Sequence, residues 1–193
     1  SDQTAPTIIT GQTAETSIAT DDTILIHDTS ASALRKMTRA NFVSGIGGTN
    51  TPAFEAYLSS DQSISDGATT KVQFNTEVFD TDSAYDNSSN YRFTPTTAGK
   101  YYVSAGLKTE STASSIQNAT LFIYKNGSSY KRSVLYAPSA KPDAFPVFID
   151  AIIDMNGSSD YLEIYIYIDI TSGSARCDAD TKACHFKSYK IIE

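Results

Sequence analysis

Apolar and polar residues alternate with a period of two along much of the chain from residue 53 onward. The clearest stretch is 161–168, where leucine or isoleucine occupies every even position and tyrosine or glutamate every odd one. That period is typical of a β-strand with one buried face. Turn-forming glycine, proline and asparagine separate the stretches, and no helical period appears between them, so we predict an all-β antiparallel sandwich or jelly roll. The nine predicted strands are 53–58, 70–77, 91–95, 100–109, 119–126, 129–137, 146–155, 161–170 and 185–192.

The first 50 residues follow a different pattern. The alternation around Ile24 and Ile26 predicts a short strand, residues 33–37 predict a returning strand, and Thr38 is placed to cap a short helix that follows. This hairpin and helix contain too few apolar residues for a core of their own, which indicates an anchor or oligomerisation module. A glycine cluster that ends at Pro52 predicts the joint. We therefore expect a module over 1–50 and a larger domain over 53–193.

Charge and composition narrow the classes of function. The formal net charge of -7 and the pI of about 4.8 argue against nucleic-acid binding, which needs a basic face. The sequence contains no run of 18 apolar residues, so we predict no membrane-spanning helix. The first ten residues lack the basic and apolar regions of a secretory signal. With two histidines and no nucleophile, phosphate-loop or zinc motif, the sequence favours a protein that is not an enzyme and has no cofactor. A glycan hydrolase with paired aspartates is the enzyme alternative, and surface solubility explains such pairs more simply.

The only two cysteines, Cys177 and Cys184, lie in a polar stretch between two predicted strands. A disulfide between them would close an eight-residue loop, and free thiols are the alternative. The nearby donors are too few for zinc. Asp178 and Asp180 are too few to specify calcium, so we predict no metal site.

Short motifs recur in a fixed order along residues 53–193. They are Ala53-Phe54-x-Ala56, Phe74-Asn75, Tyr85-Asp86, Phe93-Thr94-Pro95, Gly99-x-Tyr101-Tyr102-Val103, Lys125-Asn126-Gly127, Asp160-Tyr161-Leu162 and Phe186-Lys187-Ser188-Tyr189. In this order they resemble the globular head domain shared by the complement first-component q subunits and the tumour necrosis factor family. The resemblance implies a jelly roll of about ten strands that forms a homotrimer. Ser188 stands where complement-type members usually have glycine, which leaves the packing of the last strand open.

The same resemblance implies roles for individual residues. It assigns Tyr102, Phe148 and Phe186 to the sheet that faces the trimer axis. It assigns Tyr165 and Tyr167 to the outer sheet, pointing toward solvent. There the two tyrosines are either a contact surface or a cross-strand aromatic ladder that stabilises the sheet.

Residues 28–48 are similar to a short module found near the start of many bacteriophage fibre and other virion proteins. The pattern is an aspartate with small residues, an apolar and basic strand, and then Thr38-x-Ala40-Asn41. The resemblance implies a virion structural protein, assembled in the host cytoplasm: a homotrimeric fibre, knob or capsid decoration. It would bind other virion proteins through residues 1–50, with a host-surface glycan as a candidate ligand of its head. The alternative is a secreted or cell-surface adhesion module, lectin-like, with the same trimeric head.

Overall fold

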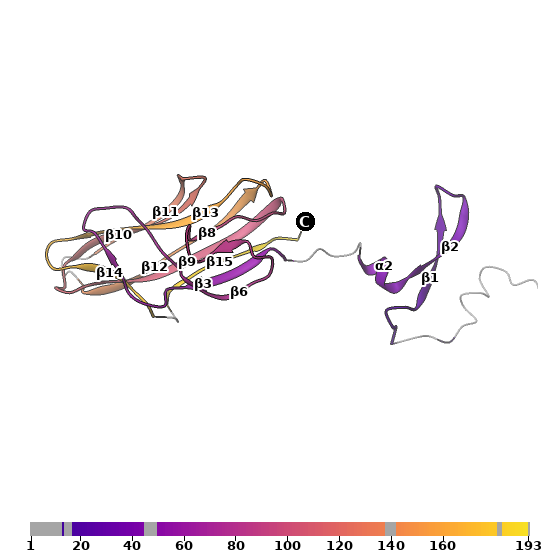
Figure 1. Cartoon of the computed structure of the whole chain (residues 1–193), viewed down its shortest axis with the longest axis horizontal. Helices are drawn as coiled ribbons and strands as arrows, with labels where there is room; N and C mark the ends of the chain where they lie inside the picture. Colours follow the sequence, from indigo (N-terminus) through magenta and orange to yellow (C-terminus); the bar gives the residue numbers. More distant parts are fainter. Residues whose placement is uncertain (1–12, 14–16, 45–49, 138–141, 181–182, 193) are drawn as a thin grey trace, which may run out of the picture. The chain divides into compact units, whose positions relative to one another are not determined.

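The structure is a computed structural model that describes residues 13, 17–44, 50–137, 142–180 and 183–192. The chain divides into two compact units, Ser1–Gly48 and Thr49–Glu193. We call the first the N-terminal module and the second the head. Both are drawn in Figure 1.

The N-terminal module contains a β-hairpin followed by one short helix. β1 (Thr23–Asp28) pairs antiparallel with β2 (Ala33–Thr38), and α2 covers Arg39–Ser44. The predicted cap is confirmed, since the Thr38 hydroxyl accepts a hydrogen bond from the amide of Asn41 at 3.3 Å. None of the residues in these three elements is buried. The predicted end of the helix at Gly47 and the glycine cluster of the joint lie outside the described residues, apart from Pro52.

The head is a sandwich of two antiparallel sheets, which confirms the predicted all-β jelly-roll class. The first sheet has the strand order β4-β14-β9-β15-β3-β6, with β12 on the free edge of β9. The second has the order β11-β10-β13-β8-β7, with β5 also on β13. Figure 1 shows the long strands of the two layers. The bounds are β3 (Ala53–Tyr57), β4 (Gln62–Ile64), β5 (Thr70–Lys71), β6 (Thr76–Asp80), β7 (Tyr85–Asp86), β8 (Arg92–Phe93), β9 (Gly99–Ser111), β10 (Ile116–Lys125), β11 (Ser128–Tyr136), β12 (Ala144–Met155), β13 (Leu162–Ile170), β14 (Ala175–Asp178) and β15 (His185–Lys190).

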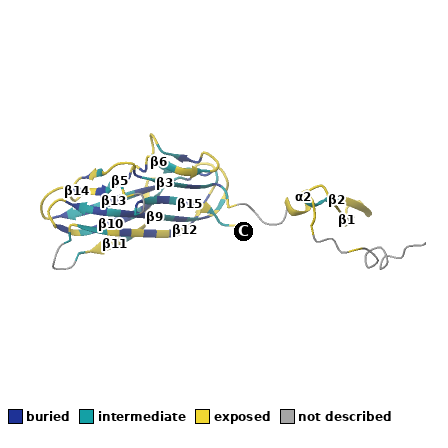
Figure 2. Cartoon of the chain, turned by 90° about the horizontal axis from the view of Figure 1, so that it is seen from below, coloured by how far each residue is buried: buried dark blue, intermediate teal, exposed yellow. Residues whose placement is uncertain are grey.

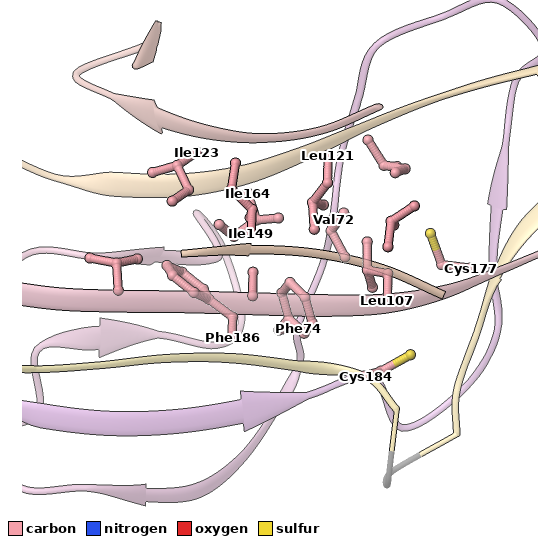
Figure 3. Close-up of a cluster of buried hydrophobic side chains, with 14 of the residues drawn as sticks. Val72, Phe74, Leu107, Leu121, Ile123, Ile149, Ile164, Cys177, Cys184 and Phe186 are labelled. Atoms are coloured by element: carbon pink, nitrogen blue, oxygen red, sulfur yellow. The ribbon is translucent and has the colours of Figure 1, made fainter. Parts of the chain in front are cut away.

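The side chains between the two sheets form one apolar core (Figure 3). The predicted alternation holds in β9, where Tyr101, Val103, Ala105 and Leu107 are fully buried. The even positions of β13 are buried in the same way. An aromatic group holds one part of the core together through stacked, tilted and edge-to-face ring contacts at centroid distances from 4.5 to 5.8 Å. Its members are Phe54, Phe74, Tyr85, Phe93 and Phe186.

The predicted strand 70–77 is wrong as a single element. It splits into β5 and β6, and the residues between them form no regular ladder. Side-chain amides replace that ladder: the amide of Gln73 donates to Gln62 Oε1 at 2.9 Å, and Asn75 Oδ1 accepts from the amide of Ser59 at 2.9 Å. The short strands β4, β7 and β14 were not predicted, because two to four residues carry too little periodicity.

The predicted strands 119–126 and 129–137 pair antiparallel as a hairpin. Asn126 and Gly127, with φ of 54° and 76°, form the turn between β10 and β11. Both residues have the positive φ of a type I′ turn, which matches the twist of the flanking strands. The Asn126 side chain also donates to Asp160 at 2.8 Å and accepts from the amide of Tyr161 at 2.9 Å, so the turn is joined to the start of β13.

The proposed interface role of Phe186 is wrong. The residue lies in the predicted sheet, but its side chain is fully buried between the sheets, where it packs against Phe54 and Phe74 (Figure 3). The outward positions of β15 are His185, Lys187 and Tyr189. Ser188 shares the inward side with Phe186, and its hydroxyl donates to the carbonyl of Tyr102 at 2.9 Å. Serine in place of the family's glycine is therefore accommodated by a hydrogen bond within the sheet.

Removing the Phe186 ring should strongly destabilise the head. We expect Phe186→Ala to lower the free energy of unfolding by about 3–5 kcal/mol, because the surrounding rings cannot close the cavity. Urea unfolding monitored by circular dichroism measures the change. Tyr136→Ala, at a ring that is 75% exposed, is the control and should stay within about 0.5 kcal/mol of wild type. A Phe186→Ala loss no larger than that of the control would contradict the assigned core position.

Candidate self-association face and polar patch on the head

The outward face of the first sheet carries large apolar side chains that the protomer leaves in solvent. Burial alternates strictly along β12 from Pro146 to Met155. The outward residues Phe148 and Ile152 are 56% and 59% exposed. Figure 2 shows exposed and buried segments along β12. Such exposure of isoleucine and phenylalanine on a flat sheet is unusual for a surface that meets only water.

The strand register places the side chains of this face in rows that run across neighbouring strands. Ile152, Tyr102 and Tyr189 lie side by side across β12, β9 and β15, and the two tyrosine rings are 5.4 Å apart. Phe148 lies opposite Gly106 and beside His185 in a parallel row. We call these six residues the apolar face. A polar row of Asp150, Ser104, Lys187 and Glu55 runs between its two halves.

Gly106 allows the second row to pack closely on the backbone of β9. A Cβ at this position would lie 2.7 Å from Cδ1 of Phe148 and 2.8 Å from Cε1 of His185. Any side chain here would push both rings away from the sheet. The glycine therefore holds Phe148 and His185 flat against the strand and keeps the face level.

His185 is a titratable ring on the apolar face. Burial lowers the pKa of His185, the neighbouring Lys187 lowers it further, and Glu55 partly opposes both. Its Nε2 lies 3.2 Å from the hydroxyl of Ser104. This contact joins a histidine to a serine, but within the described residues no carboxylate is hydrogen-bonded to the ring, so the pair lacks the third member of a hydrolase triad.

Tyr165 has a stacked environment on the outward face of the second sheet. Its ring stacks on Tyr124 at 4.2 Å, and the ammonium of Lys71 lies 5.7 Å from its centroid. Lys71 also pairs with the buried carboxylate of Glu163 at 2.5 Å. Tyr165 is thus already in contact with Tyr124 and Lys71, and the geometry favours the aromatic-ladder alternative for this residue.

Tyr167 is in a different environment from Tyr165. Its side chain has no hydrogen bond or ring contact with another described residue, and it is only partly buried. Next to it, a register shift in β10 between Ile116 and Asn118 brings two amide side chains to one carboxylate. The amides of Gln117 and Asn118 donate to the two oxygens of Asp169 at 3.3 and 3.0 Å. The sequence did not single out this group, because the bulge that assembles it has no recognisable residue pattern.

The predicted disulfide is not formed in the structure, where both cysteines are free and buried. Cys177 lies in β14, paired with β9, and is not part of a polar loop as predicted. The thiol of Cys184 donates to the carbonyl of Asp178 at 2.6 Å. Burial raises the pKa of both thiols, so both are held in the neutral form. Figure 3 shows the two sulfur atoms beside the apolar core.

The structure adds two negative findings for the residues it describes. No group of three or more histidine, cysteine, aspartate or glutamate side chains is arranged to hold a metal ion. No helix in the described ranges has the length and apolar character to cross a membrane.

The head resembles solved structures in fold. The globular domain of zebrafish complement 1qA protein is 15% identical, covers 73% of this chain and 98% of its own, and superposes with a TM-score of 0.53. Murine APRIL at pH 5.0 is 10% identical with a TM-score of 0.55, and the coverage is 72% and 98%. Eiger TNF from S. frugiperda is 13% identical with a TM-score of 0.50, and the coverage is 72% and 91%. No family model and no curated protein matches the sequence. At these identities the likeness shows the fold: the head is a jelly roll of the complement-q and tumour-necrosis-factor type.

Acidification should destabilise the head through His185. Because burial lowers the folded-state pKa below the unfolded value of about 6.5, the unfolded chain takes up a proton that the folded chain resists. The free energy of unfolding therefore falls as the pH drops from about 7 to about 5.5. We expect His185→Gln to flatten this dependence in thermal melts at the two pH values. His27→Gln, in the N-terminal module, is the control, and an unchanged slope in His185→Gln would contradict the assignment.

Proposed function

We propose that this protein is a homotrimeric structural component of a bacteriophage virion, either a fibre or knob or a capsid decoration. The observation that carries the proposal is the apolar face, with Phe148, Ile152 and Tyr189 each more than 40% exposed on a well-ordered sheet. The N-terminal module attaches the protein to other virion proteins, and the head faces outward. The protein works by binding and catalyses no reaction.

Self-association explains why the apolar face is tolerated. Exposed isoleucine and aromatic rings gain free energy when a second protomer removes them from water. The face includes Tyr102 and Tyr189, and aromatic residues are enriched in the centres of stable interfaces. In a cyclic arrangement of three heads, each apolar face packs against neighbouring heads, and no copy of the face is left uncovered at an end. The likeness to complement-q and tumour-necrosis-factor heads favours three protomers as the closed number.

The N-terminal module supports an attachment role because no residue of its described hairpin and helix is buried. Leu25 and Leu34, which are diagonal neighbours on one face of the hairpin, are 62% and 67% exposed. An isolated two-stranded hairpin is marginal in water, and this one becomes stable when another surface covers those leucines. Its similarity to modules at the start of phage fibre proteins indicates that the surface belongs to a virion.

The second candidate is a secreted or cell-surface adhesion module with the same trimeric head. The solved structures with a similar fold favour this candidate. They include zebrafish complement 1qA protein, murine APRIL and Eiger TNF. Mass spectrometry separates the two candidates. Finding the chain in gradient-purified phage particles supports the virion role, and finding it only in culture medium or at a cell surface supports the second.

A charge on the apolar face should separate the protomers. We expect Phe148→Asp, and likewise Tyr102→Asp, to give folded monomers or aggregates, because the interface cannot bury an unpaired carboxylate. Light scattering after size-exclusion chromatography gives the mass of the complex. Tyr136→Asp, on the opposite sheet, is the matched control and should remain trimeric. An intact trimer in Phe148→Asp would place the interface elsewhere.

Deleting residues 1–48 should uncouple assembly of the head from attachment. The head has its own core, so we expect it to remain folded and trimeric in light scattering. Particles assembled with the shortened chain should lack the protein when analysed by gel electrophoresis. Incorporation of the shortened chain at the wild-type level would refute an anchor role for the module. An unfolded head would show that the two units are not independent.

A further inference from the structure

The outward face of the second sheet contains a polar cluster between two unoccupied tyrosine rings. Tyr136 on β11 lies opposite Asn118 on β10, and Asn118 lies opposite Asp169 on β13. Tyr167 stands two residues before Asp169 on the same face. Together with Gln117 these residues form a continuous surface, which we call the bulge patch.

The polar groups of the bulge patch are oriented and have hydrogen-bonding capacity left. Each oxygen of Asp169 accepts one amide hydrogen, from Gln117 or Asn118, and this fixes all three side chains. Among the described residues no donor occupies the amide oxygen of either side chain. Each amide also keeps one free N–H, and the carboxylate keeps unused lone pairs. The cluster thus offers donors and acceptors a few ångströms apart, which is the pattern that vicinal sugar hydroxyls match.

The two tyrosines supply the apolar part of such a site. Tyr136 is 75% exposed, and the side chains of Tyr136 and Tyr167 contact no other ring among the described residues. Tyr124 and Tyr165, one to two rows away, are already stacked on each other. A free aromatic face next to fixed polar groups suits the C–H face of a sugar ring. Neighbouring strands are about 4.8 Å apart, so β11 and β13, with β10 between them, are about 10 Å apart. At this spacing the rings of Tyr136 and Tyr167 can contact the two sugar units of a disaccharide.

The β-bulge explains how the strand presents this chemistry. In a regular ladder successive residues point to opposite faces, so Gln117 and Asn118 could not both reach Asp169. The register shift places both amides beside the same carboxylate. Bulges commonly re-aim side chains in this way beside functional sites. A row of aromatic side chains on the surface of a sheet does not need a β-bulge to keep the protein soluble.

We propose that the bulge patch is a glycan-binding site that takes two or more sugar units of a neutral oligosaccharide. Asp169, Gln117 and Asn118 bind the hydroxyls, and Tyr136 and Tyr167 stack on the rings. A neutral ligand is favoured because the chain has a net charge of -7 and Asp169 is the charged group of the patch. The proposal rests on the proposed function, since it names the ligand that the outward-facing head would bind. Three copies on one trimer would strengthen weak individual contacts.

A glycan array probed with the full-length protein tests this site. The array carries neutral and acidic oligosaccharides from bacterial surface polysaccharides. We expect binding to neutral members, and a loss of about tenfold or more in Asp169→Ala, as for hydrogen bonds to a charged group. Tyr136→Ala and Tyr167→Ala should also lose binding, whereas Tyr167→Phe, which keeps the ring, should retain it. Tyr130→Ala, at an exposed tyrosine elsewhere on β11, is the matched control.

The outcomes separate this inference from the proposed function, because light scattering reports the mass of the same samples. The glycan site is refuted if the protein binds no oligosaccharide, or if binding survives Asp169→Ala and Tyr167→Ala. An intact trimer in the same samples would still support the structural role. Binding only to acidic members overturns the stated ligand class. A monomeric protein that still binds neutral sugars through Asp169 supports the site and refutes the trimer.

Discussion

The pairing of β9 on both of its edges is the constraint on which the head depends. One edge pairs with β12 along twelve residues, and the other pairs with β15 and then β14. With its backbone groups satisfied on both sides, β9 has no freedom to rotate, and its side chains must alternate between the core and the outer face. Tyr101 therefore enters the core while Tyr102 joins the apolar face. Two adjacent tyrosines have different roles for this reason alone.

β12 is an edge strand of the first sheet, and two lysines from the second sheet bind its backbone. Lys131 donates to the carbonyl of Asp150 at 2.6 Å, and Lys125 donates to the carbonyl of Asp154 at 2.6 Å. These bonds satisfy carbonyls of β12 that no strand pairs. They discourage edge-to-edge pairing with another chain, which is the usual risk of an unpaired strand. In the proposed trimer, the apolar face is then the favoured contact between protomers.

Much of this architecture could be predicted from the sequence, because long strands with one buried face carry a strong period of two. The strands β9, β12 and β13 were predicted within a few residues of their ends. The prediction failed for Phe186, since in β15 the outward residues His185, Lys187 and Tyr189 are as bulky as the inward ones. Only the register shows which side faces the core. It also failed between Val72 and Asn75, where buried positions alternate without a continuous strand: the amide of Val72 donates to the carbonyl of Ile164 in β13, and the amide of Gln73 donates to the side chain of Gln62.

The candidate surfaces differ in how far the sequence could reveal them. The resemblance grouped Phe148 with Tyr102, and both lie on the outward side of the first sheet. It placed Tyr165 and Tyr167 on the other sheet, where both lie in β13. Tyr165 could not be separated from Tyr167 by pattern, because its stacking on Tyr124 depends on a residue in another strand. The contacts of Asp169 could not be predicted for the same reason, because Gln117 and Asn118 reach it only through an extra residue in β10. The two surfaces lie on opposite sheets, so a trimer formed through the first sheet leaves the second free. The proposed self-association and the proposed glycan binding can therefore be tested independently, since the two surfaces share no side chain.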